Sequence, residues 1–249
     1  VEQDSSVTNE IELPTSGNAG DMAYWNGTAW VILASPSYSN RQILYFINNK
    51  PQWVPPVDST DVYSPITGKV WMDRNLGASR VATSSTDALA YGDLYQWGRA
   101  ADGHEKRNSG TTPMLATSDT PGHGNFITNN NLPYEWRNPQ NNNLWQGVSG
   151  TNNPCPNGYR LPTEAEWDAE RTSWSSNNAA GAFASPLKLP EASIRFNSDG
   201  TIFNVSSLGD YWSSTVAGIY ARDLYFNSSN AGMTSYYRAY GFSVRCIKD

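Results

Sequence analysis

Apolar residues near the start of the chain form two short alternating patterns, each interrupted by turn-forming residues. In 21–31 (DMAYWNGTAWV) two apolar stretches flank Asn26-Gly27, a dipeptide that favours a tight hairpin turn. The segment 42–54 (QILYFINNKPQWV) repeats the plan with a longer turn. An isolated hairpin is marginally stable in water, so we expect these two to pack on each other, on the main domain or on neighbouring subunits. Pro55-Pro56 then indicates a stiff linker.

The pattern changes near Asp58, and we therefore divide the chain into N-terminal hairpin repeats, 1–57, and a main domain, 58–249. In the main domain, 62–73 (VYSPITGKVWMD) predicts a strand, a turn and a strand. The segment 86–99 (TDALAYGDLYQWGR) predicts a helix with Thr86 as its N-cap. The apolar coverage of this helix comes from Leu89, Tyr91, Leu94, Tyr95 and Trp97.

The segment 103–153 is rich in Asn, Gly and Pro and has no hydrophobic period. A stretch of this length without a period is either a functional loop or an ordered covering of the core. Because Trp136 and Trp145 lie within it, we expect a covering loop that the two indoles hold in place.

A capping box gives the clearest local signal in the chain. In Thr163-Glu164-Ala165-Glu166 the Thr163 hydroxyl and the Glu166 carboxylate each satisfy a backbone donor of the other, which predicts a helix over 164–174. Short apolar segments separated by Gly, Asn and Ser then predict antiparallel strands at 184–189, 193–196, 201–205, 211–215, 223–226 and 242–247. Two helices among many short strands predict an α+β domain.

The run from Gly218 to Cys246 (GIYARDLYFNSSNAGMTSYYRAYGFSVRC) places large aromatic residues among Gly, Ser, Asn and Ala, with no helical or strand period. Tyr among small polar residues is typical of an evolved binding surface, because a rigid ring supplies contact area while Ser, Asn and Gly adapt their hydrogen bonds. The alternative for each Tyr is ordinary partial burial with a satisfied hydroxyl. The clustering of the tyrosines favours a binding surface.

The composition narrows the class of protein. The chain has 249 residues, of which 38% are hydrophobic and 12% aromatic, enough to bury a core. A formal net charge of −6 without any cluster of Lys and Arg argues against a nucleic-acid partner. No apolar stretch is long enough to span a bilayer, so we expect no direct membrane insertion.

The first residues of the chain lack the basic and apolar regions of a signal peptide, so we expect either a cytosolic chain or a leader already removed. High Trp, Tyr, Asn, Ser and Gly content with few charges is typical of exported or virion-displayed proteins. We therefore expect an extracellular, cell-surface or virion location.

Cys155 and Cys246 are the two cysteines of the chain. They suit a disulfide that closes a loop of about 90 residues, which the chain-entropy model values at about 4 kcal/mol. The alternative is two unrelated buried thiols. With no CxxC pair and two histidines in the chain, a structural zinc site is not expected.

Several ordered motifs resemble one family. They are CPNGYRLPTEAEW at 155–167, YWSST at 211–215, GFSVRC at 241–246 and TGKVWMDRNLG at 67–77. Together they are similar to the major paralogous domains of Bacteroidetes surface proteins. The resemblance implies a C-type lectin-like fold, with two helices and short antiparallel strands, over the main domain. The hairpins resemble stalk repeats of secreted Bacteroidetes proteins and phage fibre proteins.

The C-terminal run is similar to the variable regions of target proteins of diversity-generating retroelements, in which adenines of Asn codons are mutagenised. Such codons can become Tyr, Ser, Thr, Asp, Gly, Ala, Arg or Ile, but not Trp, Gln, Lys, Glu or Met. Between Val216 and Val244 the one residue from the excluded set is Met233. The resemblance implies a diversified ligand-binding surface formed by Ile219, Tyr220, Asp223, Gly232, Thr234, Ser235, Tyr236, Tyr237 and Tyr240. It implies a fixed scaffold formed by Leu224, Tyr225, Phe226, Phe242, Val244 and Cys246.

Motifs for known chemistry are missing or explained otherwise. The Glu-Pro-Asn, Gln-Pro-Asp and Trp-Asn-Asp motifs of calcium-dependent lectins do not occur, so neither a metal site nor a cofactor is predicted, although an incidental oxygen-ligated ion stays open. Glu164 and Glu166 are accounted for by the helix cap. His104 and His123 lie in Gly-rich loops without a matched nucleophile.

Three hypotheses for function follow. The first is a displayed receptor-binding protein or adhesin, whose Tyr-rich surface binds a protein or glycan receptor on another cell while its N-terminal segment contacts pilus or fibre subunits. The second is an oxidase of the formylglycine-generating type, which the resemblance to that broad fold raises; its chemistry needs a cysteine pair near the C-terminus, whereas Cys155 lies far back and suits a structural bridge. The third is a purely structural pilus or fibre subunit. We favour the first, a non-enzyme.

Overall fold

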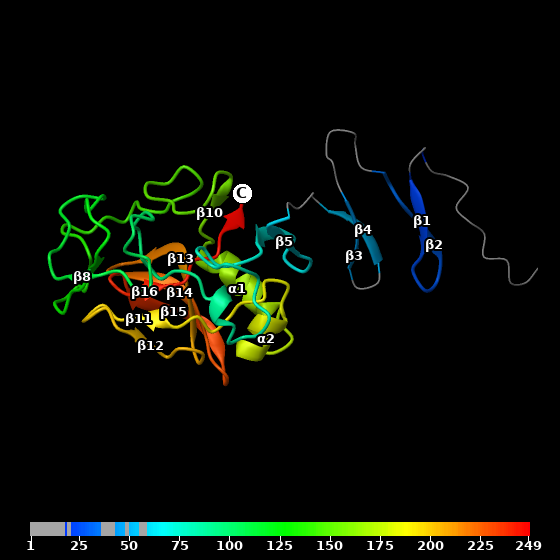
Figure 1. Ribbon diagram of the computed structural model, residues 1–249. Coiled ribbons are helices and arrows are strands. Elements are labelled where there is room, and N and C mark those ends of the chain that lie inside the picture. Colours follow the sequence, from blue (N-terminus) through cyan, green and yellow to red (C-terminus); the bar gives the residue numbers. More distant parts are fainter. Residues whose placement is uncertain (1–17, 19–20, 36–42, 48–49, 55–58) are drawn as a thin grey trace, which may run out of the picture. The chain divides into compact units, whose positions relative to one another are not determined.

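The computed structural model describes residues 18, 21–35, 43–47, 50–54 and 59–249 (Figure 1). The chain divides into two compact units, Val1–Asp58 and Ser59–Asp249. The predicted linker Pro55-Pro56 lies outside the described residues. No helix in the described ranges is long and apolar enough to cross a membrane.

The first unit contains both predicted hairpins. Strands β1 (Met22–Trp25) and β2 (Trp30–Leu33) pair antiparallel, as do β3 (Ile43–Ile47) and β4 (Lys50–Val54). In the first turn the side-chain oxygen of Asn26 accepts hydrogen bonds from the backbone N–H groups of Thr28 and Ala29, each at 2.9 Å. Gly27, at φ +102°, has a backbone conformation that a residue with a Cβ rarely adopts. The Asn-Gly pair thus makes this turn as the sequence predicted.

The second unit is built mainly of strands. An α+β class is loosely compatible with it, but the predicted C-type lectin-like fold is wrong. Within the described residues the α-helices are α1 (Glu164–Thr172) and α2 (Ala179–Ala184), of nine and six residues. The strands are distributed over several small, mostly antiparallel sheets. Regular structure in this unit is therefore dominated by β-sheet, and the lectin-like arrangement that the motifs implied is not shown.

One predicted helix, over 86–99, does not form and accounts for part of this error. The segment contains a single 3-10 turn, η1 (Ala88–Ala90), and then a short strand, β7 (Tyr95–Gln96). Gly92 and Gly98 have φ values of +69° and +85°, which break any continuous right-handed helix. The apolar spacing in 86–99 serves to bury Leu94, Tyr95 and Trp97 from an irregular segment.

Three sheets organise the second unit. A four-stranded sheet has the order β10 (Tyr159–Arg160), β17 (Ile247–Lys248), β6 (Lys69–Met72), β5 (Asp61–Ser64). Another has the order β12 (Ile202–Phe203), β11 (Ile194–Arg195), β16 (Gly241–Phe242), β7. A three-stranded sheet has the order β13 (Gly209–Ala217), β14 (Tyr220–Phe226), β15 (Ala231–Tyr237). A short parallel pair, β8 (Thr111–Thr112) and β9 (Phe126–Ile127), lies within the loop 103–153.

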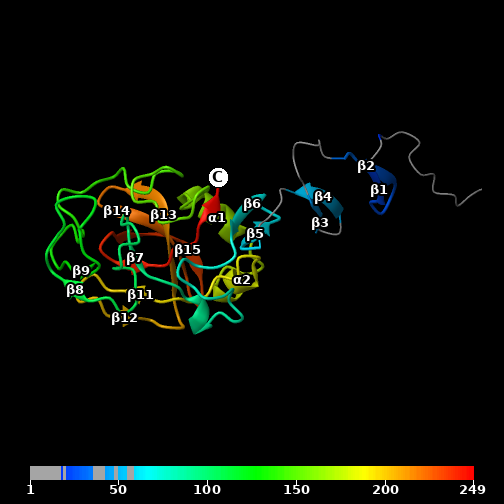
Figure 2. The same cartoon turned by 45° about the horizontal axis from the view of Figure 1, so that its top comes forward.

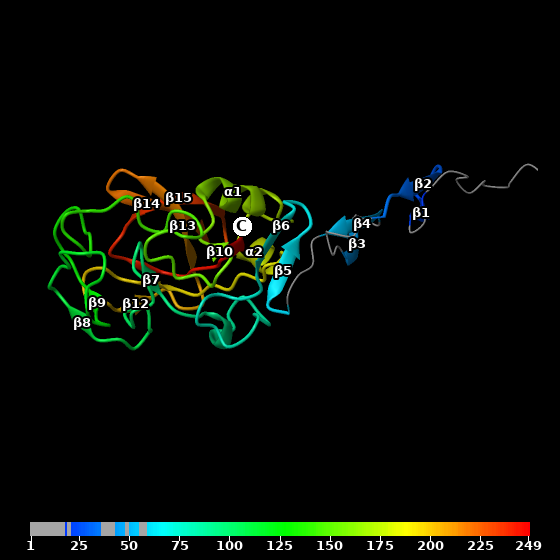
Figure 3. The same cartoon turned by 90° about the horizontal axis from the view of Figure 1, so that it is seen from above.

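The three-stranded sheet carries a core on each face. Helix α1 packs against one face of this sheet (Figure 3). There the Trp167 ring contacts the rings of Trp71 and Tyr211. On the other face Trp212 stacks on Phe242 with ring centroids 4.2 Å apart. The predicted helix and its capping box are confirmed, because the Glu166 N–H donates to the Thr163 hydroxyl and the Thr163 N–H donates to the Glu166 carboxylate. The packing of Trp167 against Trp71 and Tyr211 holds α1 on the sheet.

The loop 103–153 is an ordered covering, as its tryptophans indicated. The indole N–H of Trp136 donates to the Trp97 carbonyl at 2.7 Å, and that of Trp145 donates to the Asn152 carbonyl at 2.8 Å. Both rings are fully buried. Figure 2 shows this loop, in green, gathered with β8 and β9 at one end of the unit, away from α2, β5 and β6.

Strand prediction from the sequence succeeded for some segments and failed for others. The strand pair at 62–73 is confirmed by β5 and β6, whereas the predicted strand at 184–189 begins at the last residue of α2. Strand β15 was missed, although it is seven residues long. Six of its residues are half-buried on both faces, so its sequence shows no alternation of apolar and polar residues.

The predicted disulfide is present. The sulfur atoms of Cys155 and Cys246 are 2.09 Å apart. Cys246 is fully buried and immediately precedes β17. The bond therefore ties the end of the covering loop to the C-terminal strand, and it is consistent with an oxidising, extracellular location.

Candidate ligand-binding site

A pocket of about 320 Å³ lies at the end of β15. Three stretches of chain line it. Tyr237 and Tyr240 come from the C-terminal run, Asn130 and Tyr134 from the covering loop, and Phe196, Asn197 and Ser198 from the segment after β11. We call this the tyrosine pocket.

The residues between the two C-terminal tyrosines point inward and thereby place both tyrosines at the pocket. Arg238 is buried, and its guanidinium carbon lies 4.4 Å from the centroid of the Trp97 ring. The same guanidinium donates to the carbonyl of Gly218 at 3.0 Å and to the side chain of Asn142 at 2.8 Å. Burial lowers the pKa of Arg238. Arg238 is therefore a structural residue of the Tyr-Tyr-Arg-Ala-Tyr stretch.

Tyr134 forms the facing wall in a backbone conformation that tyrosine rarely adopts. Its φ is +51°, in the left-handed region. Its N–H donates to the Asn131 carbonyl at 2.7 Å, and its carbonyl accepts the N–H of Ala239 at 3.1 Å. Its ring packs edge-on against Tyr237, with centroids 4.5 Å apart. Strain of this kind persists only where surrounding contacts enforce it, and it clusters at functional sites.

Aromatic contacts continue outward from the pocket. Tyr237 pairs with Tyr220 across β14 and β15, with ring centroids 4.7 Å apart and hydroxyl oxygens 3.4 Å apart. Tyr240 contacts Phe196 at 5.6 Å and Tyr236 at 5.1 Å between centroids. Each such pair adds about 0.5–1.5 kcal/mol beyond the area it buries, so the rings hold one another in place.

The polar groups of the tyrosine pocket have few partners in the protein. The hydroxyls of Tyr134, Tyr240 and Ser198 and the side-chain amide of Asn130 make no hydrogen bond within the described part of the chain. None of the residues lining the pocket is charged. These groups offer both donors and acceptors above aromatic rings. A neutral ligand surface with hydrogen-bonding groups matches this lining.

The nine predicted ligand-binding residues do not form one patch. Residues paired across an antiparallel sheet share a face. The pairs Asp223–Thr234 and Tyr225–Gly232 lie on one face, with Tyr236 next along it, and the pair Tyr220–Tyr237 lies on the other, together with Ser235. Ile219 lies in the turn before β14 and is exposed. The structure brings Tyr237 and Tyr240 into the tyrosine pocket, with Tyr220 and Tyr236 in contact with them.

Ser235 is held by a charged pair from another element. The Arg222 guanidinium donates to the Ser235 hydroxyl at 2.6 Å and to the Glu164 carboxylate at 2.8 Å. Glu164 belongs to the first turn of α1, so this pair joins the helix to the sheet. The hydroxyl of Ser235 is therefore used inside the protein.

Asp223 is fully buried and does not reach the ligand-facing surface. Its carboxyl lies against that of Asp210 on the neighbouring strand, and no other group in the described chain bonds to their four oxygens. Burial raises the pKa of Asp210 to about 7, and burial together with the Asp210 charge raises the pKa of Asp223 well above its ordinary value. A shared proton is the arrangement that two such carboxyls favour. Asp223 is a structural residue beneath the surface.

Five residues of the tyrosine pocket were missed from the sequence: Asn130, Tyr134, Phe196, Asn197 and Ser198. Two residues separate Tyr134 from the stretch Asn129-Asn130-Asn131, and this mixture of Tyr and Asn is the kind that singled out the C-terminal run. That signal was available, but the tryptophans of the loop directed the interpretation toward covering. The expected scaffold residues Leu224, Phe226, Phe242, Val244 and Cys246 are buried, and Tyr225 is half-buried.

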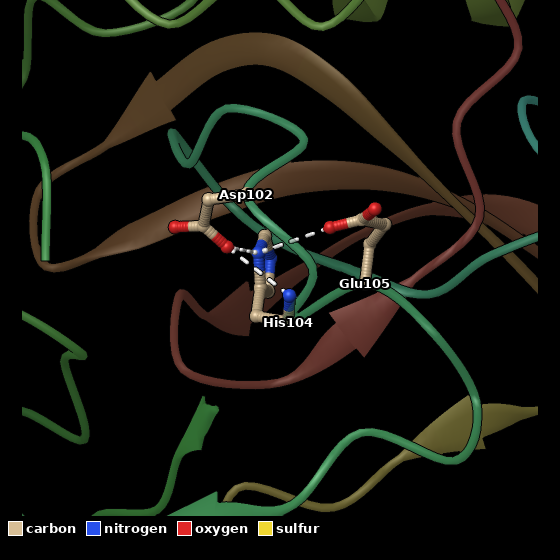
Figure 4. Close-up of side chains that lie close together, drawn as sticks. All are labelled: Asp102, His104 and Glu105. Carbon is tan, nitrogen blue, oxygen red and sulfur yellow. Dashed lines mark hydrogen bonds and ion pairs between the residues drawn. The ribbon is translucent and has the colours of Figure 1, made fainter. Parts of the chain in front are cut away.

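Asp102, His104 and Glu105 form the one cluster among the described residues that has the residue types of a metal site (Figure 4). Both ring nitrogens of His104 are occupied: Nδ1 lies 2.7 Å from the Asp102 carboxylate, and Nε2 accepts the Gln96 N–H at 3.0 Å. Burial lowers the pKa of His104 to about 4, so the ring is neutral and donates from Nδ1. The cluster is therefore a structural hydrogen-bond network. The second histidine, His123, accepts the Asn125 N–H, and no nucleophilic side chain in the described chain bonds to its ring.

Comparisons of the chain with protein-family models, with curated proteins and with solved structures found no match. The family resemblance therefore rests on the sequence motifs alone. The functional argument rests on the geometry of the tyrosine pocket and of the sheet beside it.

Proposed function

We propose that this protein is a displayed binding protein that engages a partner on another cell through the tyrosine pocket and the tyrosines around it. The observation that carries the proposal is the lining of the pocket, which holds three tyrosines and a phenylalanine. Within the described chain, no partner bonds to the hydroxyls of Tyr134, Tyr240 and Ser198 or to the Asn130 amide. Rigid aromatic side chains beside adaptable polar ones are typical of recognition surfaces. Buried aromatic anchors of this kind carry most of the affinity in many interfaces.

The arrangement around the pocket supports recognition because its parts are fixed before any ligand arrives. Arg238, Ala239 and the Tyr134 carbonyl hold the walls by internal hydrogen bonds. A site that is already ordered loses less entropy on binding, which favours affinity. The disulfide is consistent with display outside the cell.

The oxidase alternative lacks support at its central residues. Both cysteines of the chain are joined in the disulfide, and Cys246 is fully buried. A thiol-based oxidation needs a free, accessible thiolate. The structural-subunit alternative would leave the unpaired groups of the tyrosine pocket without a role.

The test uses the biotinylated full chain on an array of extracellular proteins and on an array of neutral glycans. Tyr237→Ala and Tyr240→Ala should each weaken the captured interaction at least about tenfold, as hot-spot residues do. Tyr24→Ala, which removes a tyrosine from the hairpin unit, is the matched control and should bind like the unmodified chain. Retention of full binding by both pocket variants, with their folds intact, would remove the basis of the proposal.

We further propose that the C-terminal run is a diversified segment, as its resemblance implies. A near copy of its coding sequence, with Asn codons at the ligand-facing positions and a reverse transcriptase gene beside it, is the expected genomic observation. A coding region with no such copy in a complete genome contradicts this part of the proposal and leaves the binding assay unaffected.

A further inference from the structure

Strand β15 is the outer strand of its sheet. Among the strands that the structure describes, the order β13, β14, β15 leaves the far side of β15 without a neighbour. An edge strand presents a row of backbone N–H and C=O groups that can pair with another chain. The hairpin that joins β14 to β15 determines which backbone groups of β15 point away from the sheet.

The hairpin fixes the direction of every backbone group in β15. The Asn227 N–H donates to the Asn230 carbonyl at 2.9 Å, so these residues form a hydrogen-bonded pair at the turn. Hydrogen-bonded and non-hydrogen-bonded pairs then alternate along an antiparallel ladder. Gly232, Thr234 and Tyr236 therefore bond to β14, whereas Met233, Ser235 and Tyr237 direct their backbone groups outward.

The two ends of this outward row have internal partners, and its middle has none. The Ala231 carbonyl accepts the Asn177 side-chain amide at 2.8 Å, and the Tyr237 carbonyl accepts the Tyr240 N–H at 3.1 Å. Between them, the N–H and C=O groups of Met233 and Ser235 and the N–H of Tyr237 make no hydrogen bond within the described residues. Five adjacent groups are thus free to pair.

This edge lacks the features that usually protect an edge strand. Proteins block such edges with charged residues, proline or a bulge. The sequence AGMTSYY contains neither a charge nor a proline, and its register with β14 runs without a shift from Ala231 to Tyr237. By contrast, β13 has a register shift between Trp212 and Val216. An open, regular, uncharged edge is suited to a partner strand.

We propose that β15 binds an extended segment of a protein ligand as an added strand of the sheet. This inference rests on the proposed function and names the kind of partner. Tyr237 connects the two sites, because its N–H is the last free donor of the edge and its ring lines the tyrosine pocket. A segment of about five residues matches the length of the free row, and a strand on this edge leads to the pocket.

The test exploits the outward direction of the Ser235 N–H. Ser235→Pro removes that N–H and leaves the ladder to β14 intact, because proline is tolerated on edge strands. Ser235→Ala is the matched control, since both variants lose the hydroxyl that Arg222 binds but only the proline loses the N–H. Met233→Pro and Met233→Ala form a second pair for use if Ser235→Pro fails a thermal-unfolding check.

The probe is a phage-displayed library of random 12-residue peptides, panned on the full chain. Selected peptides should bind the unmodified chain and Ser235→Ala alike, and should bind Ser235→Pro at least about tenfold more weakly, the loss expected when an unpaired acceptor is left. In the unmodified chain, hydrogen exchange at the amides of Met233 and Ser235 should slow at least tenfold on peptide binding, while that of Thr234, already paired, stays unchanged.

Several outcomes overturn the assignment. One is that the selected peptides bind Ser235→Pro with the affinity that they show for the unmodified chain. Another is that peptide binding does not slow hydrogen exchange at the amides of Met233 and Ser235. A third is that the library yields no peptide whose binding depends on the edge of β15. Sedimentation of the free chain as a dimer that Ser235→Pro dissociates would assign the edge to a second copy instead.

If Tyr237→Ala and Tyr240→Ala abolish array binding while Ser235→Pro keeps it, the edge proposal fails and the proposed function stands. If the tyrosine variants bind fully, the proposed function fails.

Discussion

The last part of the C-terminal run, 231–246, has two halves that differ in where their polar groups find partners. In the second half, 241–246, the buried guanidinium of Arg245 donates to the Asn75 side chain and to the carbonyls of Met72 and Leu187, and Cys246 is in the disulfide. In the first half, 231–240, the outward backbone groups of Met233 and Ser235 and the Tyr240 hydroxyl have no partner in the described chain. We call these the anchored half and the open half.

The contrast teaches that the open half is not loosely built. Its rings contact one another, Arg238 is bonded on several sides, and β15 keeps an unbroken register. Unpaired groups on a fixed frame differ from unpaired groups on a mobile loop, because their positions are set before a ligand binds. Four predictions test this division, beginning with the largest expected effect.

Removing the disulfide should cost the most. In Cys155→Ser/Cys246→Ser we expect the free energy of unfolding to fall by about 4 kcal/mol, because the unfolded chain regains the entropy of a long loop. Urea unfolding at pH 7 measures this, and the unmodified protein treated with dithiothreitol should behave alike. A loss below about 1 kcal/mol, within the effect of an ordinary substitution, would show that the anchored half is held by Arg245 and packing instead.

The buried carboxyl pair lies between the halves, because the Asp210 carbonyl accepts the Ser243 N–H while Asp223 stands opposite Thr234. The pKa of Asp210 is raised to about 7 from an ordinary 3.8. Below pH 3.8 the carboxyl of Asp210 is protonated in both the folded and the unfolded chain, so its burial costs no ionisation energy. As the pH rises from 3.8 toward 7, the unfolded chain loses this proton before the folded chain does, and the free energy of unfolding falls. Asp210→Asn should add on the order of 4 kcal/mol at pH 8 and little at pH 3.5, since each tenfold change in proton affinity is about 1.4 kcal/mol.

The measurement is urea unfolding of both proteins across this pH range. Asp168→Asn, at a half-buried position of α1 where the carboxylate pairs with Arg171, is the control and should show no comparable gain at pH 8. An Asp210→Asn protein that is no more stable than the unmodified chain at pH 8 contradicts the shared-proton arrangement.

Tyr211 offers a hydroxyl that is fully used. It donates to the Pro190 carbonyl at 2.7 Å and accepts from the Asn75 side chain at 3.1 Å, in a fully buried position. Tyr211→Phe leaves both partners unsatisfied, so we expect thermal and urea unfolding to show a loss of about 2 kcal/mol. An unchanged midpoint would mean that water replaces the hydroxyl at this position.

Tyr240→Phe should have the smallest effect on stability. The Tyr240 hydroxyl has no hydrogen bond within the described residues, so its removal should change the free energy of unfolding by less than about 0.5 kcal/mol. The same substitution should weaken ligand binding on the arrays, because the hydroxyl remains available to a partner. A stability loss as large as that of Tyr211→Phe would erase the distinction between the two halves.

Local signals in the sequence predicted the elements that depend on neighbours along the chain. The capping box at Thr163 gave α1, Asn26-Gly27 gave a hairpin turn, and the two cysteines gave the disulfide. Each of these is decided by a few residues and their preferred geometry. The composition of the C-terminal run correctly directed attention to Tyr237 and Tyr240, which meet in the tyrosine pocket.

The features that could not be predicted from the sequence depend on contacts between residues that are far apart in the chain. The overall arrangement of sheets was misjudged, and β15 was missed because half-buried residues on both faces erase the period that marks a strand. The sequence analysis assigned Asp223 to the ligand-binding surface, whereas the fold buries it beside Asp210. Tyr134 and Phe196 reach the pocket through chain turns that no local pattern encodes.

The three separate origins of the tyrosine pocket have a consequence for its specificity. Substitutions confined to the C-terminal run would replace Tyr237 and Tyr240 but would leave Tyr134, Phe196 and the Asn130 amide in place. Every such variant would thus inherit the same half of the pocket. Its ligands would differ in the part that meets the run and share one chemical feature, an aromatic-stacking group with a hydrogen-bonding rim, that the constant half selects.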